Sequence, residues 1–139
     1  MKSQIRFAQF CDDIRQEING KWILIGCYGS NMVVSSFPYN NSISCFVTGA
    51  CDPETKSADI EYSLASGAVI GRMHMEIIAI VGDKPDIIQL PVPPLPISLS
   101  RGDELILKLR FGDEEMQEVG RLRVEQGDVS KLTQGQAMQ

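Results

Sequence analysis

The chain has 139 residues, of which 43% are hydrophobic, so it is long enough to bury a core without disulfides or metal ions. Its 13 Lys and Arg against 18 Asp and Glu give a formal charge of −5. This balance argues against an extended nucleic-acid interface, because affinity for phosphates is built from many cations. The longest apolar run, residues 77–81, is far too short to span a bilayer, and the first residues do not resemble a signal peptide. We therefore expect a cytoplasmic protein that does not enter a membrane.

The first predicted element is a hairpin. Residues 5–11 alternate between apolar and polar side chains, which is the period of a strand, and Asn19-Gly20 is a strong two-residue turn signal. Residues 21–28 form the returning strand, and here both faces are apolar, with Ile23 and Ile25 on one of them. A strand with two apolar faces needs cover on both sides, so we expect Ile23 and Ile25 to lie in an interface.

Three more strands are predicted in the middle of the chain, over residues 32–36, 43–51 and 58–64. Residues 37–41 are predicted to form a loop because of their Pro and Asn content. The glycines of residues 67–71 interrupt the strand pattern before it resumes.

A long strand is predicted over residues 72–81. Its outer face begins with polar side chains and ends with Ile78 and Ile80. We expect this apolar end to be covered by another subunit, together with the face that carries Ile23 and Ile25.

Residues 91–96 contain a cluster of prolines, which forces the backbone to be extended. We interpret the cluster as a rigid connection between two sheets. A polyproline ligand is the alternative, but the basic residues that commonly flank such ligands are missing. Short strands are predicted at residues 95–100, 104–110 and 121–125, and a polar tail follows at residues 129–139.

Together, eight to ten short strands separated by turns predict an all-β protein, a single-domain antiparallel β-sandwich of the immunoglobulin-like or C2-like kind. The domain is predicted to span residues 1–128, since no linker or repeat divides the chain.

The cysteines do not show the spacing of a metal site. Their separations along the chain are 16, 18 and 6 residues, without a C-x-x-C pair, and His74 is the one histidine that could join them. Without a secretory signal, a disulfide framework is also disfavoured. We expect no metal and no cofactor, and buried free thiols at all four positions: Cys11, Cys27, Cys45 and Cys51.

The N-terminal third carries a recognisable pattern. Residues 10–17, FCDDIRQE, followed by Gly20-Lys21 and by LIGCY at residues 24–28, resemble the pattern F-C-D-D-I-R-x-E-x-x-G-K-x-x-L-I-G-x-Y of a group of short, uncharacterised bacterial and phage proteins. The similarity covers about residues 7–38. It implies a small β-sandwich from a bacterial cell or a phage-infected host, and it implies no activity. The polar and aromatic residues that it marks as site candidates are Asp12, Asp13, Arg15, Lys21 and Tyr28.

The candidate catalytic groups do not form a recognisable constellation. Asp12 and Asp13 are neighbours, and neighbours on a strand point to opposite faces unless the strand bulges. We expect them to have a turn or strand-end role with Arg15 or Lys21 as partner. No nucleophile motif accompanies His74, which is predicted to be a surface histidine. No catalytic residue is assigned, and a hydrolase that uses Asp12, Asp13 and His74 is the weakest of the functional hypotheses.

A basic patch is the sharpest binding hypothesis. If residues 104–111 and 121–125 pair as a hairpin, their outward side chains include four cations that could hold a phosphate-bearing ligand. These cations are Lys108, Arg110, Arg121 and Arg123. The alternative is a solvated face balanced by Glu104, Glu118 and Glu125.

Three functions follow from these observations. The first is a non-enzymatic binding module that self-associates through its apolar outer faces into a homo-oligomer. The second is an oligomer that binds or sequesters a small anionic, nucleotide-like ligand, for instance in phage counter-defence. The third is the hydrolase.

Overall fold

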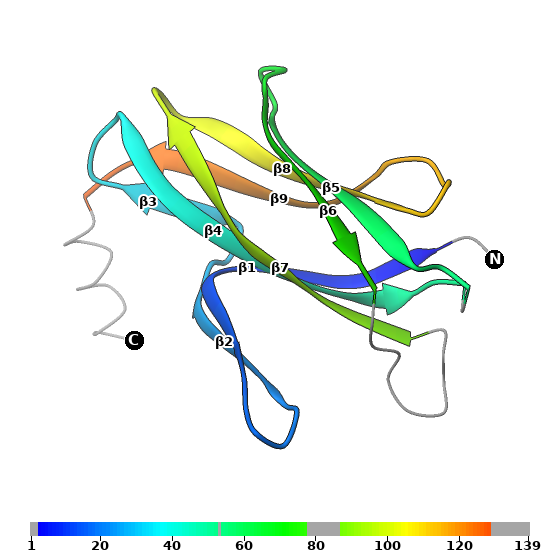
Figure 1. Cartoon of the computed structure of the whole chain (residues 1–139). Helices are drawn as coiled ribbons and strands as arrows, with labels where there is room; N and C mark the ends of the chain where they lie inside the picture. The colour runs from blue at the N-terminus through cyan, green and yellow to red at the C-terminus, as the bar shows by residue number, and fades with distance from the viewer. Residues whose placement is uncertain (1–2, 53, 78–86, 129–139) are drawn as a thin grey trace.

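The structure is a computed structural model that describes residues 3–52, 54–77 and 87–128. Nine strands in these ranges form two sheets stacked face to face, as Figure 1 shows. The strands are β1 (Gln4–Gln16), β2 (Trp22–Cys27), β3 (Asn31–Val34), β4 (Tyr39–Ala50), β5 (Ser57–Leu64), β6 (Val69–Glu76), β7 (Ile87–Leu99), β8 (Asp103–Phe111) and β9 (Gln117–Gln126). The predicted all-β sandwich is confirmed. Within the described ranges, no helix is long and apolar enough to cross a membrane.

One sheet has the order β2-β1-β4-β7 and the other the order β3-β9-β8-β5-β6. The pairs are antiparallel except for β3 and β9, which run parallel. The sandwich is therefore mostly antiparallel, as predicted, with β3 and β9 as the exception. After β2 the chain crosses to the other sheet, where β3 forms an edge strand, and then returns to the first sheet as β4. β3 therefore lies beside β9 and runs in the same direction as β9.

Two predicted connections are strands instead. Residues 39–41 belong to β4, because Tyr39 and Asn41 pair with Leu99 and Ile97 of β7. The proline cluster is part of β7, which lies at the edge of the four-stranded sheet and does not connect the two sheets. A proline lacks the amide proton that a central strand would donate, but an edge strand has one side without a strand partner and tolerates the loss.

The strand predicted at residues 72–81 is also shifted. β6 begins at Val69, inside the predicted interruption, and ends at Glu76. The predicted interface residues Ile78 and Ile80 lie outside the described residues, as does the polar tail of residues 129–139.

The core lies between the sheets and is built from the alternate side chains that the period-2 pattern supplies. Leu107, Leu109 and Leu122 of the five-stranded sheet are fully buried, and each such side chain is worth about 1.5–3 kcal/mol relative to exposure. The ring of Phe10 crosses from the other sheet and packs against Tyr62, with ring centroids 6.5 Å apart. Gly120 leaves room for Phe10, since a Cβ there would lie 3.1 Å from the ring.

Candidate functional site

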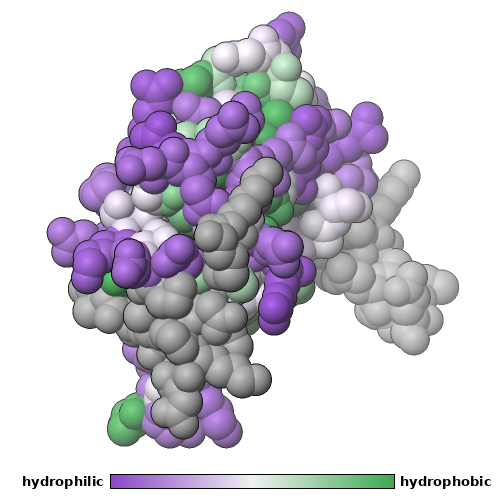
Figure 2. Space-filling model, turned by 90° about the vertical axis from the view of Figure 1, so that its right-hand side faces the viewer, coloured by the Kyte–Doolittle hydropathy of each residue, from purple (hydrophilic) through white to green (hydrophobic). Residues whose placement is uncertain are grey.

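A hairpin made by the second half of β1 and by β2 projects from the body of the sandwich (Figure 1). We call residues 12–27 the arm. Its tip carries the fully exposed Ile18, and β2 carries Ile23 and Ile25 with 41% and 40% of their surface exposed. Figure 2 shows hydrophilic side chains over most of one side of the described protein, with smaller apolar areas between them and a small apolar group at the lower end, where the arm lies. The cover expected over Ile23 and Ile25 is therefore not supplied by the described part of the same chain.

The base of the arm is held by three residues of the N-terminal pattern. Gly26 has a φ of +67°, and its missing Cβ leaves the space in which the carboxylate of Asp12 sits. The hydroxyl of Tyr28 donates a hydrogen bond to that carboxylate. Burial raises the pKa of Tyr28, and the hydrogen bond to Asp12 raises it further, so the phenol keeps its proton. Asp12, Gly26 and Tyr28 thus form one structural unit where the arm leaves the sheet.

The other pattern residues lie on the arm itself. The carboxylate of Asp13 accepts from the guanidinium of Arg15 at 3.1 Å, and both side chains are solvent-exposed. The predicted partner Arg15 is thus confirmed for Asp13. Asp12 instead has Tyr28 as its partner, and both carboxylates lie within β1, not at a turn or strand end. Lys21 lies just after the turn, where its amide donates to the side chain of Asn19 at 3.1 Å.

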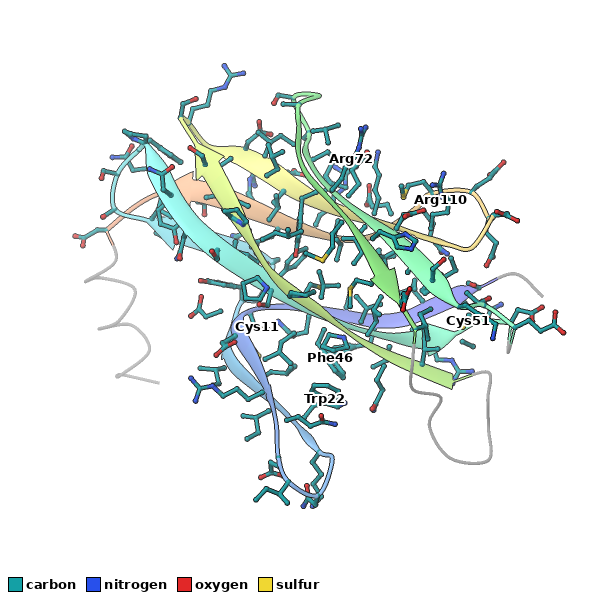
Figure 3. All side chains as sticks on the ribbon, viewed as in Figure 1. Cys11, Trp22, Phe46, Cys51, Arg72 and Arg110 are labelled. Carbon is teal, nitrogen blue, oxygen red and sulfur yellow. The ribbon has the colours of Figure 1, made fainter. Side chains whose placement is uncertain are left out.

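The arm is anchored to the sheet by one aromatic side chain. The ring of Trp22 packs against Phe46 of β4, with centroids 5.7 Å apart, and its indole N–H donates to Gln89 of β7 at 3.0 Å. Figure 3 shows Trp22 and Phe46 side by side in the angle between the arm and the four-stranded sheet. Trp22 thus ties the start of β2 to two strands of the four-stranded sheet.

β2 forms one edge of its sheet, and it differs from the three other edge strands of the described residues. β7 carries the proline cluster, β6 carries alternate charged or imidazole side chains, and β3 has only four residues. Each of these features discourages pairing with another chain. β2, with the sequence WILIGC, has neither proline nor charge.

The second candidate region is the outer face of the five-stranded sheet, where charges of opposite sign face each other across the strands. Asp59 of β5 accepts from the Nδ1 of His74 at 2.7 Å and from the Nη2 of Arg110 at 2.7 Å. These two hydrogen bonds lower the pKa of Asp59, and the one with His74 has the larger effect. In the next row, Glu61 pairs with Arg72 at 3.2 Å. Figure 3 places Arg72 and Arg110 on this face.

The predicted basic patch lies on this face. The hairpin of β8 and β9 is confirmed, and it brings the four cations onto adjacent strands. They are accompanied by carboxylates: Arg121 binds both Glu104 and Glu118, at 2.9 and 2.8 Å, and Lys108 lies opposite Glu118. Arg123 lies opposite Glu104. The face is therefore an alternation of charges, close to the balanced alternative that the sequence left open.

A shallow hollow of about 460 Å³ opens beside Arg72, His74 and Arg110, with Asp59 and Glu61 also in its lining. Sequence reasoning missed the pairing of His74 with Asp59. The signal was present, because a hairpin that turns at Ser66-Gly67 aligns residues 59 and 74.

The three residues of the hydrolase hypothesis are not brought together. Asp12 and Asp13 lie on β1 with their own partners, and His74 lies on β6 in the other sheet with Asp59. Among the described residues, no group of three or more His, Cys, Asp or Glu could hold a metal ion. No family model matches the chain, and no curated protein sequence matches it.

Proposed function

We propose that this protein is a non-enzymatic binding module that self-associates by pairing the free edge of β2 with the β2 of a second copy. The observation that carries the proposal is the chemistry of this edge. Among the described residues no strand pairs with the outer side of β2, and the strand lacks the proline and charge present on β6 and β7. A strand of this kind is a template for a further strand.

The side chains of β2 favour a symmetric pair. In a two-fold antiparallel pair centred on Leu24, Ile23 of each copy would lie opposite Ile25 of the other, on one face of the joined sheets. Asp13 and Arg15 flank this face, because they pair in register with Ile25 and Ile23. Since these two charges already bind each other, they would form a neutral polar rim around an apolar centre.

Native mass spectrometry of the full chain tests the proposal. We expect the wild-type protein to be a dimer or a larger even-numbered oligomer, and Ile25→Lys to be a monomer, since a charge on the edge opposes pairing. Val69→Lys is the matched control, because Val69 is 47% exposed on the edge strand β6 and should leave the assembly unchanged. A wild-type monomer, or an Ile25→Lys variant that assembles like the wild type, would contradict the proposal.

A small anionic ligand remains the second candidate function. The hollow beside Arg72, His74 and Arg110 favours it, but a ligand there would have to compete with Asp59 and Glu61 for the guanidinium groups. In the same spectrum, such a ligand would add mass to the wild-type protein. That added mass should be lost when Arg72 and Arg110 are both replaced by Ala, and its persistence would place the ligand elsewhere.

A further inference from the structure

Two of the cysteines face each other at the base of the arm. Cys11 of β1 and Cys27 of β2 are register partners, and Figure 3 labels Cys11 where the arm leaves the sheet. In the adjacent pair, the amide of Tyr28 donates to the carbonyl of Phe10 at 2.9 Å. The pair next to a hydrogen-bonded one is of the non-hydrogen-bonded type, whose Cα atoms are about 4.5 Å apart with the side chains on one face. This separation lies within the range of natural disulfides, about 4.4–6.8 Å.

The two thiols differ in access to solvent. Both are free, and Cys11 is fully buried, whereas Cys27 is exposed. The prediction of buried thiols is therefore wrong for Cys27. Burial, with a smaller effect from the neighbouring Cys27, raises the pKa of Cys11 to about 11. A dissolved oxidant therefore reaches Cys27 first, while Cys11 lies beside Cys27 as a protonated thiol.

We propose that Cys11 and Cys27 are a modification site at which a peroxide forms an intramolecular disulfide between the two strands of the arm. The thiolate of Cys27 attacks one oxygen of hydrogen peroxide, so that an S–O bond forms, the O–O bond breaks and hydroxide leaves. The sulfur of Cys27 is thereby oxidised to a sulfenic acid. The sulfur of Cys11 then attacks that of Cys27, the S–S bond forms, and the S–O oxygen leaves as hydroxide. The protons of the two thiols convert both hydroxides to water, and the balance is two thiols and one peroxide to one disulfide and two waters.

The disulfide would cross-link the arm next to Gly26. The bridge lies one residue from Gly26, whose positive φ and contact with Asp12 interrupt the ordinary strand geometry. It would tie β2 to β1 at the point where the arm joins the sandwich. The reaction needs only one chain, so it stands whether or not β2 pairs with a second copy.

Peptide mapping of the oxidised full chain tests this site. The reduced protein is treated with hydrogen peroxide, its remaining thiols are alkylated, and it is digested with trypsin and chymotrypsin without reductant. Cleavage at Arg15, Lys21 and Tyr28 separates the two cysteines from each other and from Cys45. We expect a linked peptide that contains Cys11 and Cys27, lighter by two hydrogen atoms than its parts and split by dithiothreitol.

Two variants sharpen the result. Cys27→Ser changes an exposed side chain and should abolish the linked peptide, whereas Cys45→Ala, at a buried cysteine outside the pair, should retain it. The proposal is overturned if Cys27 accumulates as sulfinic acid while Cys11 is alkylated. A disulfide between Cys27 residues of two molecules, without the internal link, would overturn it equally.

Discussion

The hydroxyl of Tyr62 lies in the core without a hydrogen-bond partner among the described residues. The residue is 1% exposed, and burial raises the pKa of its phenol, so the group is neutral and shielded from bulk solvent. A buried polar group without a partner costs about 1–3 kcal/mol. Tyr62→Phe removes the hydroxyl and keeps the ring contact with Phe10. We therefore expect this substitution to raise the free energy of unfolding by about 1 kcal/mol or more.

Tyr28→Phe is the matched comparison, because it removes the same atom from a hydroxyl that donates to Asp12. It should lower the free energy of unfolding by about 1 kcal/mol, the usual net value of a hydrogen bond. Both variants are measured by urea unfolding, and an unchanged slope with denaturant shows that the denatured state is comparable. If Tyr62→Phe is destabilising by a similar amount, the Tyr62 hydroxyl has a partner and the description of the core is wrong.

Two further predictions concern a glycine and a carboxylate. Gly49→Ala should lower the free energy of unfolding by about 1–3 kcal/mol, because a Cβ there would lie 2.3 Å from a carbonyl oxygen of β1. Gly71→Ala is the control in the same urea titration, because no atom of the described residues would lie within 4 Å of its Cβ. Hydrogen bonds from His74 and Arg110 lower the pKa of Asp59 in the folded protein. The ionised carboxylate therefore stabilises the folded state at pH values above the ordinary pKa of an aspartate. This stabilisation is lost as the pH falls through the lowered pKa of the folded state. Thermal unfolding below about pH 4 should therefore depend less on pH in Asp59→Asn than in the wild type, and equal slopes would refute the assignment.

The fold class could be predicted because the strands alternate with period 2 and are separated by strong turn signals. The order of the strands could not, since alternation says which face a side chain occupies and nothing about the neighbouring strand. The proline cluster shows the limit. Prolines exclude a central strand and are equally compatible with a connection or an edge strand. Only the pairing of residues 87–99 with β4 shows that the cluster belongs to an edge strand.

The candidate site could also be predicted only in part from the sequence. The apolar residues Ile23 and Ile25 were predicted to need cover because both faces of their strand are apolar, and the described part of the chain leaves them exposed. The basic patch was predicted from one hairpin, but the carboxylates that balance it come partly from β5, a strand far away in the sequence. Charge complementarity across non-adjacent strands depends on register, which a single sequence does not contain.

The carboxylate of Asp12, a residue of the N-terminal pattern, occupies the space that a side chain at Gly26 would fill. A substitution at Gly26 therefore tests whether the arm depends on this contact. In Gly26→Ala the new Cβ would lie 2.1 Å from the Asp12 carboxylate. The left-handed backbone costs an alanine about 1–2 kcal/mol, and displacing Asp12 from Tyr28 should cost about 1 kcal/mol more. Gly112→Ala is the control, because its φ is +57° and nothing in the described part of the chain would lie within 4 Å of its Cβ.

We therefore expect Gly26→Ala to lose about 1 kcal/mol more than Gly112→Ala in urea unfolding. Adding Asp12→Ala should abolish this extra loss, because the clash and the hydrogen bond disappear together, and a double-mutant cycle measures the coupling. If the two glycine variants lose the same free energy, the carboxylate of Asp12 does not depend on the missing side chain. The glycine would then be required for its backbone conformation alone, and the arm would not be held by the unit of Asp12, Gly26 and Tyr28.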